Sequence, residues 1–118
     1  MDEKLKYVKL NYLEEISDGN KDFINEIINM FLKQVPEFLF NMRKYLEEKE
    51  YGELCREAHT AKSSALIFEM KDTGNLLKQI ELIARDNQNN SLPALIDRVE
   101  SDLNKACREL TEYLDELY

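Results

Sequence analysis

The chain has 118 residues, of which 43% are hydrophobic and 34% charged, and its formal net charge at pH 7 is −8. This balance fits one soluble globular domain over 1–118, since either half alone would be too small to bury a useful core. The acidic excess argues against a nucleic-acid partner, which would normally meet a concentrated basic face. No apolar run approaches the roughly 20 residues needed to cross a bilayer, so no membrane contact is expected.

The first four residues lack the apolar core of a secretory signal, which favours a cytoplasmic protein. We expect a chain that starts at Met1 to be a free-standing protein. Cys55 and Cys107 lie inside helical patterns and are too few for a disulfide scaffold. They are therefore predicted to be small thiols, buried or half-buried.

The pattern of the first 20 residues predicts a short helix followed by a turn. The helix is expected over about Lys4–Ile16, with its apolar side made of Leu5, Val8, Tyr12 and Leu13. Turn-forming and capping residues end it at 17–20. Asn20 or Asp18 is predicted to cap the helix that follows.

The second helix is predicted to be the longest, over about Lys21–Glu48. Its apolar positions, from Ile24 to Tyr45, recur at alternating steps of four and three residues. This spacing is typical of a helix packed in a bundle. Pro36 lies inside it, but the pattern keeps its phase on both sides, so the helix is expected to kink near Lys33–Val35 and not to end.

Three further helices complete an all-α prediction. The third covers about Tyr51–Phe68, the fourth runs from Asp72 or Thr73 to about Asp86, and the last follows a cap at Ser91. The core stripe of the third helix contains three alanines, which would let a neighbouring helix come close. The expected fold is an antiparallel four-helix bundle with a short extra N-terminal helix.

The third helix also carries the only histidine, His59. At about 100° per residue, His59 falls about 100° from the centre of the apolar stripe, at the border of the core. Cys55, Arg56, Lys62 and Ser63 are its neighbours three and four positions away. Histidine can offer an uncharged ring nitrogen as a nucleophile near neutral pH. A solitary imidazole with two nearby cations suits a group that receives and holds a phosphoryl.

The sequence around His59 resembles that of histidine-containing phosphotransfer (HPt) domains. Members of this family carry His-x-x-Lys-Gly-Ser/Ala-Ser/Ala on the second helix of a four-helix bundle. His59, Lys62, Ser64 and Ala65 match this pattern. An Asp-Gly-Asn turn before a long, proline-containing helix and a later Ile-Glu pair at 80–81 agree in order. The resemblance covers roughly residues 5–115.

Ser63 stands where the family pattern has glycine. In the family this small residue leaves room for the active-site aspartate of the partner. Serine is only slightly larger and can donate a hydrogen bond. We expect altered or somewhat hindered docking at this close-approach position, and not loss of transfer.

The resemblance implies a carrier and not an enzyme. His59 would accept a phosphoryl group from a receiver-domain aspartate and pass it to another, with Lys62 stabilising the phosphoryl. The expected partners are the receiver domains of a hybrid histidine kinase and of a response regulator. The receivers would supply Mg²⁺, so no cofactor is expected in this chain, and similar proteins are commonly monomeric. No Gly-rich phosphate loop is present to support ATP binding.

Other positions are open to two interpretations. Arg56 would contact phosphate or the partner, or simply be a solvated charge. Gln79 and Glu81 are candidates for holding the imidazole, and a glutamate would more readily orient the second ring N–H than bind phosphate. Cys55 and Leu66 are expected in the docking surface around His59.

Two rival functions follow from the same fold. One is a degenerate helical adaptor that binds a receiver or kinase without phosphotransfer. The other, much weaker, is a bundle that carries a metal or ligand. One histidine and two cysteines without ligand spacing do not make a credible zinc set, and a di-iron bundle would need two Glu-x-x-His motifs.

Overall fold

The structure is a computed structural model that describes residues 5–88 and 90–117. All regular structure in these residues is helical. The helices are α1 (Asn11–Ser17), α2 (Lys21–Glu47), α3 (Tyr51–Ile67), α4 (Lys71–Arg85) and α5 (Leu92–Leu117).

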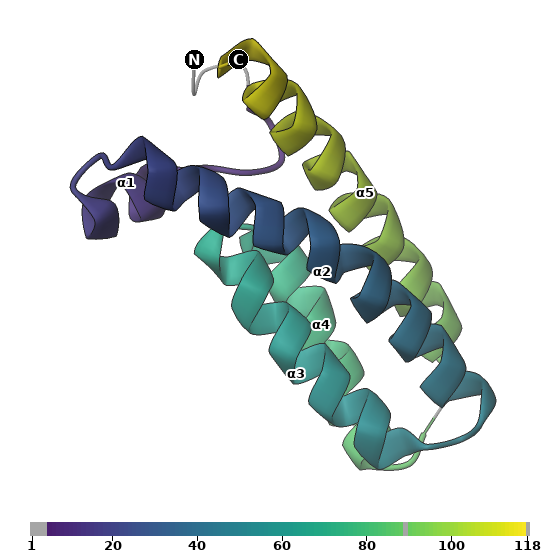
Figure 1. Cartoon of the computed structure of the whole chain (residues 1–118). Coiled ribbons are helices and arrows are strands. Elements are labelled where there is room, and N and C mark those ends of the chain that lie inside the picture. The colour runs from purple at the N-terminus through teal and green to yellow at the C-terminus, as the bar shows by residue number, and fades with distance from the viewer. Residues whose placement is uncertain (1–4, 89, 118) are drawn as a thin grey trace.

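The four long helices α2 to α5 run alternately up and down beside one another, joined by short connections (Figure 1). Short connections favour antiparallel neighbours because the chain must turn back at once. The described part is elongated, with extents of 43 × 23 × 20 Å. The short α1 lies across one end, next to the start of α2. The predicted bundle with a short N-terminal helix is thus confirmed.

The core lies between the four long helices and matches the apolar stripes of the sequence. Every predicted core position of α3 is buried, as are the apolar positions of α2 from Ile24 to Met42. α3 packs most extensively against α4. Its three buried alanines, Ala58, Ala61 and Ala65, place no bulk between the two backbones. This pairing brings side chains of the two helices together.

α2 begins and continues as its sequence predicts. The side chain of Asn20 caps it, accepting a hydrogen bond from the backbone N–H of Phe23 at 3.1 Å. The helix is continuous through Pro36. Near its other end Arg43 joins α2 to α5 by ion pairs with Asp97 and Glu100 at 2.6 and 3.1 Å.

The prediction for the first helix is wrong over much of its length. α1 begins only at Asn11, and the described residues 5–10 are not helical (Lys4 lies outside the described residues). Three successive backbone N–H groups, of Lys6, Tyr7 and Val8, donate to the carboxylate of Glu109 on α5, at 2.5, 2.8 and 3.2 Å. The amides of residues 6–8 are thus satisfied by a side chain of α5, far away in the sequence.

The same segment is held at the junction of α3 and α4. The backbone N–H of Lys9 donates to the carbonyl of Phe68 at 2.9 Å. Val8 and Leu10 of this segment and Leu13 of α1 are buried. Tyr12, which was expected on the apolar side, is instead 46% exposed. The backbone N–H of Tyr12 donates to the carboxylate of Glu69 at 3.2 Å. The N-terminal region is thus attached to α5 by Glu109 and to the end of α3 by Phe68 and Glu69.

Both cysteines are free and half-buried, as expected. Burial raises the pKa of the Cys107 thiol to about 11. That thiol is therefore protonated at neutral pH. In residues 5–88 and 90–117, no helix combines the length and the apolar character required to cross a membrane.

The attachment of residues 6–8 to Glu109 can be tested by substitution. We expect Glu109→Ala to lower the free energy of unfolding by about 1–2 kcal/mol, because three backbone amides lose a charged acceptor. Urea denaturation followed by circular dichroism measures the change. Glu112→Ala, an exposed position three residues further along α5, is the control. Equal midpoints for the two variants would show that the contact contributes nothing to stability.

Candidate functional site

His59 lies on the flank of α3, beside α4. The preceding residue, Ala58, is fully buried, so the helix geometry turns the next side chain out of the core. The His59 side chain is 59% exposed. The structure therefore places the imidazole at the water-accessible edge of the bundle, as the position of the apolar stripe predicts.

One ring nitrogen of His59 faces a carboxylate from the neighbouring helix. Nδ1 lies 3.3 Å from Oε1 and 3.2 Å from Oε2 of Glu81 on α4. An ionised carboxylate only accepts hydrogen bonds, so Nδ1 carries the proton in this contact. In the neutral ring this leaves the lone pair on Nε2. The Glu81 contact thus selects the tautomer in which Nε2 is the nucleophilic atom.

Lys62 contacts the same carboxylate. Its Nζ lies 3.4 Å from Oε1 of Glu81, and the two side chains are only 20% and 16% exposed. Lys62 is three residues after His59, on the same side of α3. The three side chains form the His59–Lys62–Glu81 cluster, in which one carboxylate lies between an imidazole and an ammonium group.

The charge of Glu81 is set by two opposing effects. Desolvation by burial acts to raise its pKa, but hydrogen bonds from His59 and Lys62, with the charge of Lys62, outweigh this effect and lower the pKa below its ordinary value. Glu81 is therefore ionised at neutral pH. The pKa of Glu81 is lower in the folded than in the unfolded state, so its ionised carboxylate stabilises the folded state at pH values above the unfolded-state pKa. This contribution is lost as the pH falls through the folded-state pKa.

Ser63 lies four residues after His59 and is exposed. Its hydroxyl donates to the backbone carbonyl of His59 at 3.3 Å. The hydroxyl is thus directed back along the helix, which keeps the profile of the side chain slim beside the imidazole. The neighbouring Ser64 points elsewhere, with Oγ 3.5 Å from Oε1 of Gln34 on α2.

The remaining predicted residues differ in how close they come to the cluster. Cys55 is half-buried one turn before His59, and Leu66 is 45% exposed about two turns after it. Arg56 is 72% exposed and forms an ion pair with Glu53 on its own helix. Gln79 is exposed and, two residues before Glu81, leaves α4 about 200° away from it, so it is not brought to the ring.

Two cations near the cluster were missed in the sequence. Lys78 and Arg85 are exposed and lie three residues before and four residues after Glu81, on the same side of α4. Their spacing of three and four residues from Glu81 was visible in the sequence, but it could be interpreted only once the structure showed that Glu81 faces His59. Among the described residues, no three His, Cys, Asp or Glu side chains gather in a way that could hold a metal ion.

Comparisons with known proteins agree with this architecture. The family model described as Hpt domain matches residues 26–117. The crystal structure of histidine-containing phosphotransfer protein B (HptB) from Pseudomonas aeruginosa PAO1 is similar to this chain, with a TM-score of 0.86 and 17% identity. The similarity covers 96% of this chain and 98% of that one. No curated protein sequence matches the chain.

The family-model match and the all-helical fold define a helical phosphotransfer module. The chain belongs to the Hpt domain family. Its class is that of histidine phosphotransfer proteins in phosphorelays, which are phosphocarriers and not kinases and which interact with receiver domains.

The tautomer of His59 is directly measurable. We expect ¹⁵N NMR of the neutral ring to show a protonated Nδ1 and an unprotonated Nε2, because Glu81 accepts from Nδ1. In Glu81→Ala the ring should move toward the mixture of an unconstrained imidazole. Glu57→Ala, on the side of α3 that faces α2, is the control, because Glu57 instead accepts from Asn41. The same spectrum in wild type and Glu81→Ala would contradict the role of Glu81.

Proposed function

We propose that His59 is the phosphoacceptor of this chain and that Glu81 and Lys62 prepare it for transfer. The observation that supports this most directly is the orientation of the ring. Nδ1 is engaged by an ionised carboxylate, whereas the ring is largely open to water. Nε2 is therefore the atom available to a partner that approaches from solvent.

The transfer step follows from this arrangement. The lone pair of Nε2 attacks the phosphorus of a receiver acyl phosphate, and the N–P bond forms as the bond from phosphorus to the aspartate oxygen breaks. The aspartate leaves as a carboxylate, and the ring becomes positively charged because Nδ1 keeps its proton. Glu81 stabilises that charge through Nδ1–H. The same steps in reverse pass the phosphoryl to a second receiver.

Lys62 supplies positive charge to the phosphoryl oxygens. In the unphosphorylated chain its ammonium group lies beside Glu81, already near His59 and held on a flexible stem. Phosphoryl transfer depends mainly on alignment and charge neutralisation, so a short list of residues is sufficient. The receiver would bring the acidic pocket and its Mg²⁺, and this chain would add the nucleophile and one cation.

The partners we propose are a receiver domain of a hybrid histidine kinase and that of a response regulator. Both would dock on the same exposed face around His59, where Cys55 and Leu66 supply apolar contacts and Lys78 and Arg85 supply positive charge. Because each partner must leave before the next binds, the interface should be small and transient. A cytoplasmic monomer with an open His59 face fits this exchange.

The decisive experiment labels the chain through a receiver. A purified receiver domain is phosphorylated with radiolabelled acetyl phosphate and then mixed with wild type or His59→Gln. We expect an acid-labile, alkali-stable label on wild type and none on the variant. His59 is the only histidine in the sequence, so any phosphohistidine reports this position. Binding of receivers to both proteins without any label would favour the adaptor and overturn the proposal.

Substitution of Ser63 tests whether its side chain limits the approach of the receiver to His59. We expect Ser63→Gly to transfer at least as fast as wild type, because it removes bulk next to the imidazole, at a stability cost of about 0.5 kcal/mol for glycine in a helix. Rapid-quench measurement of the transfer rate gives the answer. Ser63→Ala is the matched control, since it removes the hydroxyl and keeps Cβ. A sharp loss in both variants would instead give the hydroxyl a positive role.

A further inference from the structure

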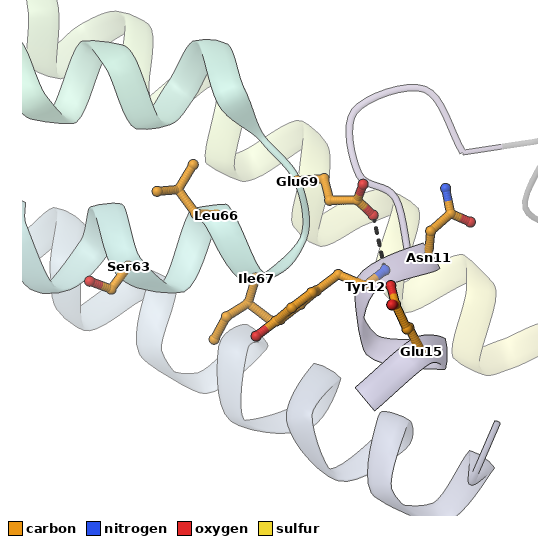
Figure 2. A pocket seen from close by; sticks show the side chains of 7 residues that line it. All are labelled: Asn11, Tyr12, Glu15, Ser63, Leu66, Ile67 and Glu69. Carbon is orange, nitrogen blue, oxygen red and sulfur yellow. Dashed lines mark hydrogen bonds between the residues drawn. The ribbon is translucent and has the colours of Figure 1, made fainter. Parts of the chain in front are cut away.

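A hollow of about 540 Å³ lies between α1 and the C-terminal end of α3. Figure 2 shows Tyr12 and Glu15 of α1 on one side, Ser63, Leu66 and Ile67 of α3 on the other, and Glu69 beside the junction. The Tyr12 side chain extends from α1 toward Ile67 (Figure 2). The hollow was not visible in the sequence, because α1 and α3 are far apart along the chain.

The lining of the hollow is apolar with an acidic border. Leu66 and Tyr12 are 45% and 46% exposed, which is high for large apolar side chains. Glu15 is exposed on α1, and Glu69 is held in place by the N–H of Tyr12 at 3.2 Å. Surfaces of this kind, apolar in the middle and polar at the border, are typical of protein–protein contact sites.

The hollow is continuous with the phosphotransfer site. Ser63 lines it and also bonds to the carbonyl of His59, one helical turn away. At the His59 end the exposed cations are Lys78 and Arg85 of α4, because Lys62 is already paired with Glu81, whereas the carboxylates of Glu15 and Glu69 lie at the hollow. A partner seated over His59 would therefore meet positive charge at one end of the contact and negative charge at the other.

We infer that the hollow binds an apolar side chain of the receiver partner that is flanked by a lysine or arginine. This inference rests on the proposed function and names a feature of the partner. The acidic border favours a basic neighbour, whereas a second copy of this chain, with net charge −8, would be repelled. The opposite charges at the two ends allow only one orientation of the receiver, which selects among receivers by complementarity.

The hollow acts on binding and not on the chemical step. None of its carboxylates contacts the His59–Lys62–Glu81 cluster in the described contacts. Changing the charge of its border should alter the encounter and the affinity, because charges at the border of an interface act mainly on association and on its salt dependence. The maximal rate of phosphoryl transfer should stay as it was.

The test reverses one charge. Wild type, Glu15→Lys and Glu112→Lys are titrated against purified receiver domains phosphorylated with radiolabelled acetyl phosphate, and rates are measured by rapid quench. We expect Glu15→Lys to raise the half-saturating concentration about 10-fold, with a maximal rate within about 2-fold of wild type. Glu112→Lys makes the same change in net charge on α5, outside the hollow, and should behave as wild type. Added salt should reduce the difference.

The outcomes separate this inference from the function on which it rests. If no receiver labels His59 in wild type, the proposed function itself fails. If wild type is labelled and Glu15→Lys has the same half-saturating concentration as Glu112→Lys, only the inference fails. A receiver whose own basic residue is changed to glutamate should regain affinity for Glu15→Lys, and Leu66→Ala should weaken binding at any salt concentration.

Discussion

The carboxylate of Glu81 lies between the imidazole of His59 and the ammonium group of Lys62, and the proposed chemistry depends on this contact. It joins α4 to α3 and selects the ring nitrogen that faces solvent. It also keeps Lys62 near the reactive ring before any phosphate arrives. Because hydrogen bonds from His59 and Lys62, with the charge of Lys62, lower the pKa of Glu81 despite desolvation, the carboxylate is charged at neutral pH. A single half-buried carboxylate thus organises both the nucleophile and the neighbouring ammonium group.

The packing of α3 against α4 makes this contact possible. Ala58, Ala61 and Ala65 are buried on the core side of α3, which packs most extensively against α4, and Glu81 of α4 reaches His59. Gly74 of α4 also lacks a side chain where α3 is near, since a Cβ at this position would lie only 2.8 Å from Cδ2 of Leu66. Small residues on the inside of the pair therefore decide which side chains meet on its outside. The bundle acts as a rigid support for a site that lies on its surface.

The sequence was most informative where local patterns decide the structure. The apolar stripes predicted the four long helices, Asn20 was one of the two residues predicted to cap α2, and the phase of α3 placed His59 at the edge of the core. The failures involve contacts between distant parts of the chain. Residues 5–10 are not helical, and the amides of residues 6–8 donate to Glu109 on α5, an acceptor that the sequence near residue 6 does not indicate. Gln79 and Glu81 were both candidates until the packing of α4 showed which one faces His59.

The attachment of the N-terminal segment has a consequence for evolution of the protein. α1 forms one wall of the hollow, and its position is fixed by Glu69 at one end and, through residues 6–8, by Glu109 on α5. A change at Glu109 would remove one of the attachments of that wall without touching the histidine. Preference for one signalling partner over another could thus drift through substitutions on the far helix, while the phosphoryl chemistry is inherited unaltered.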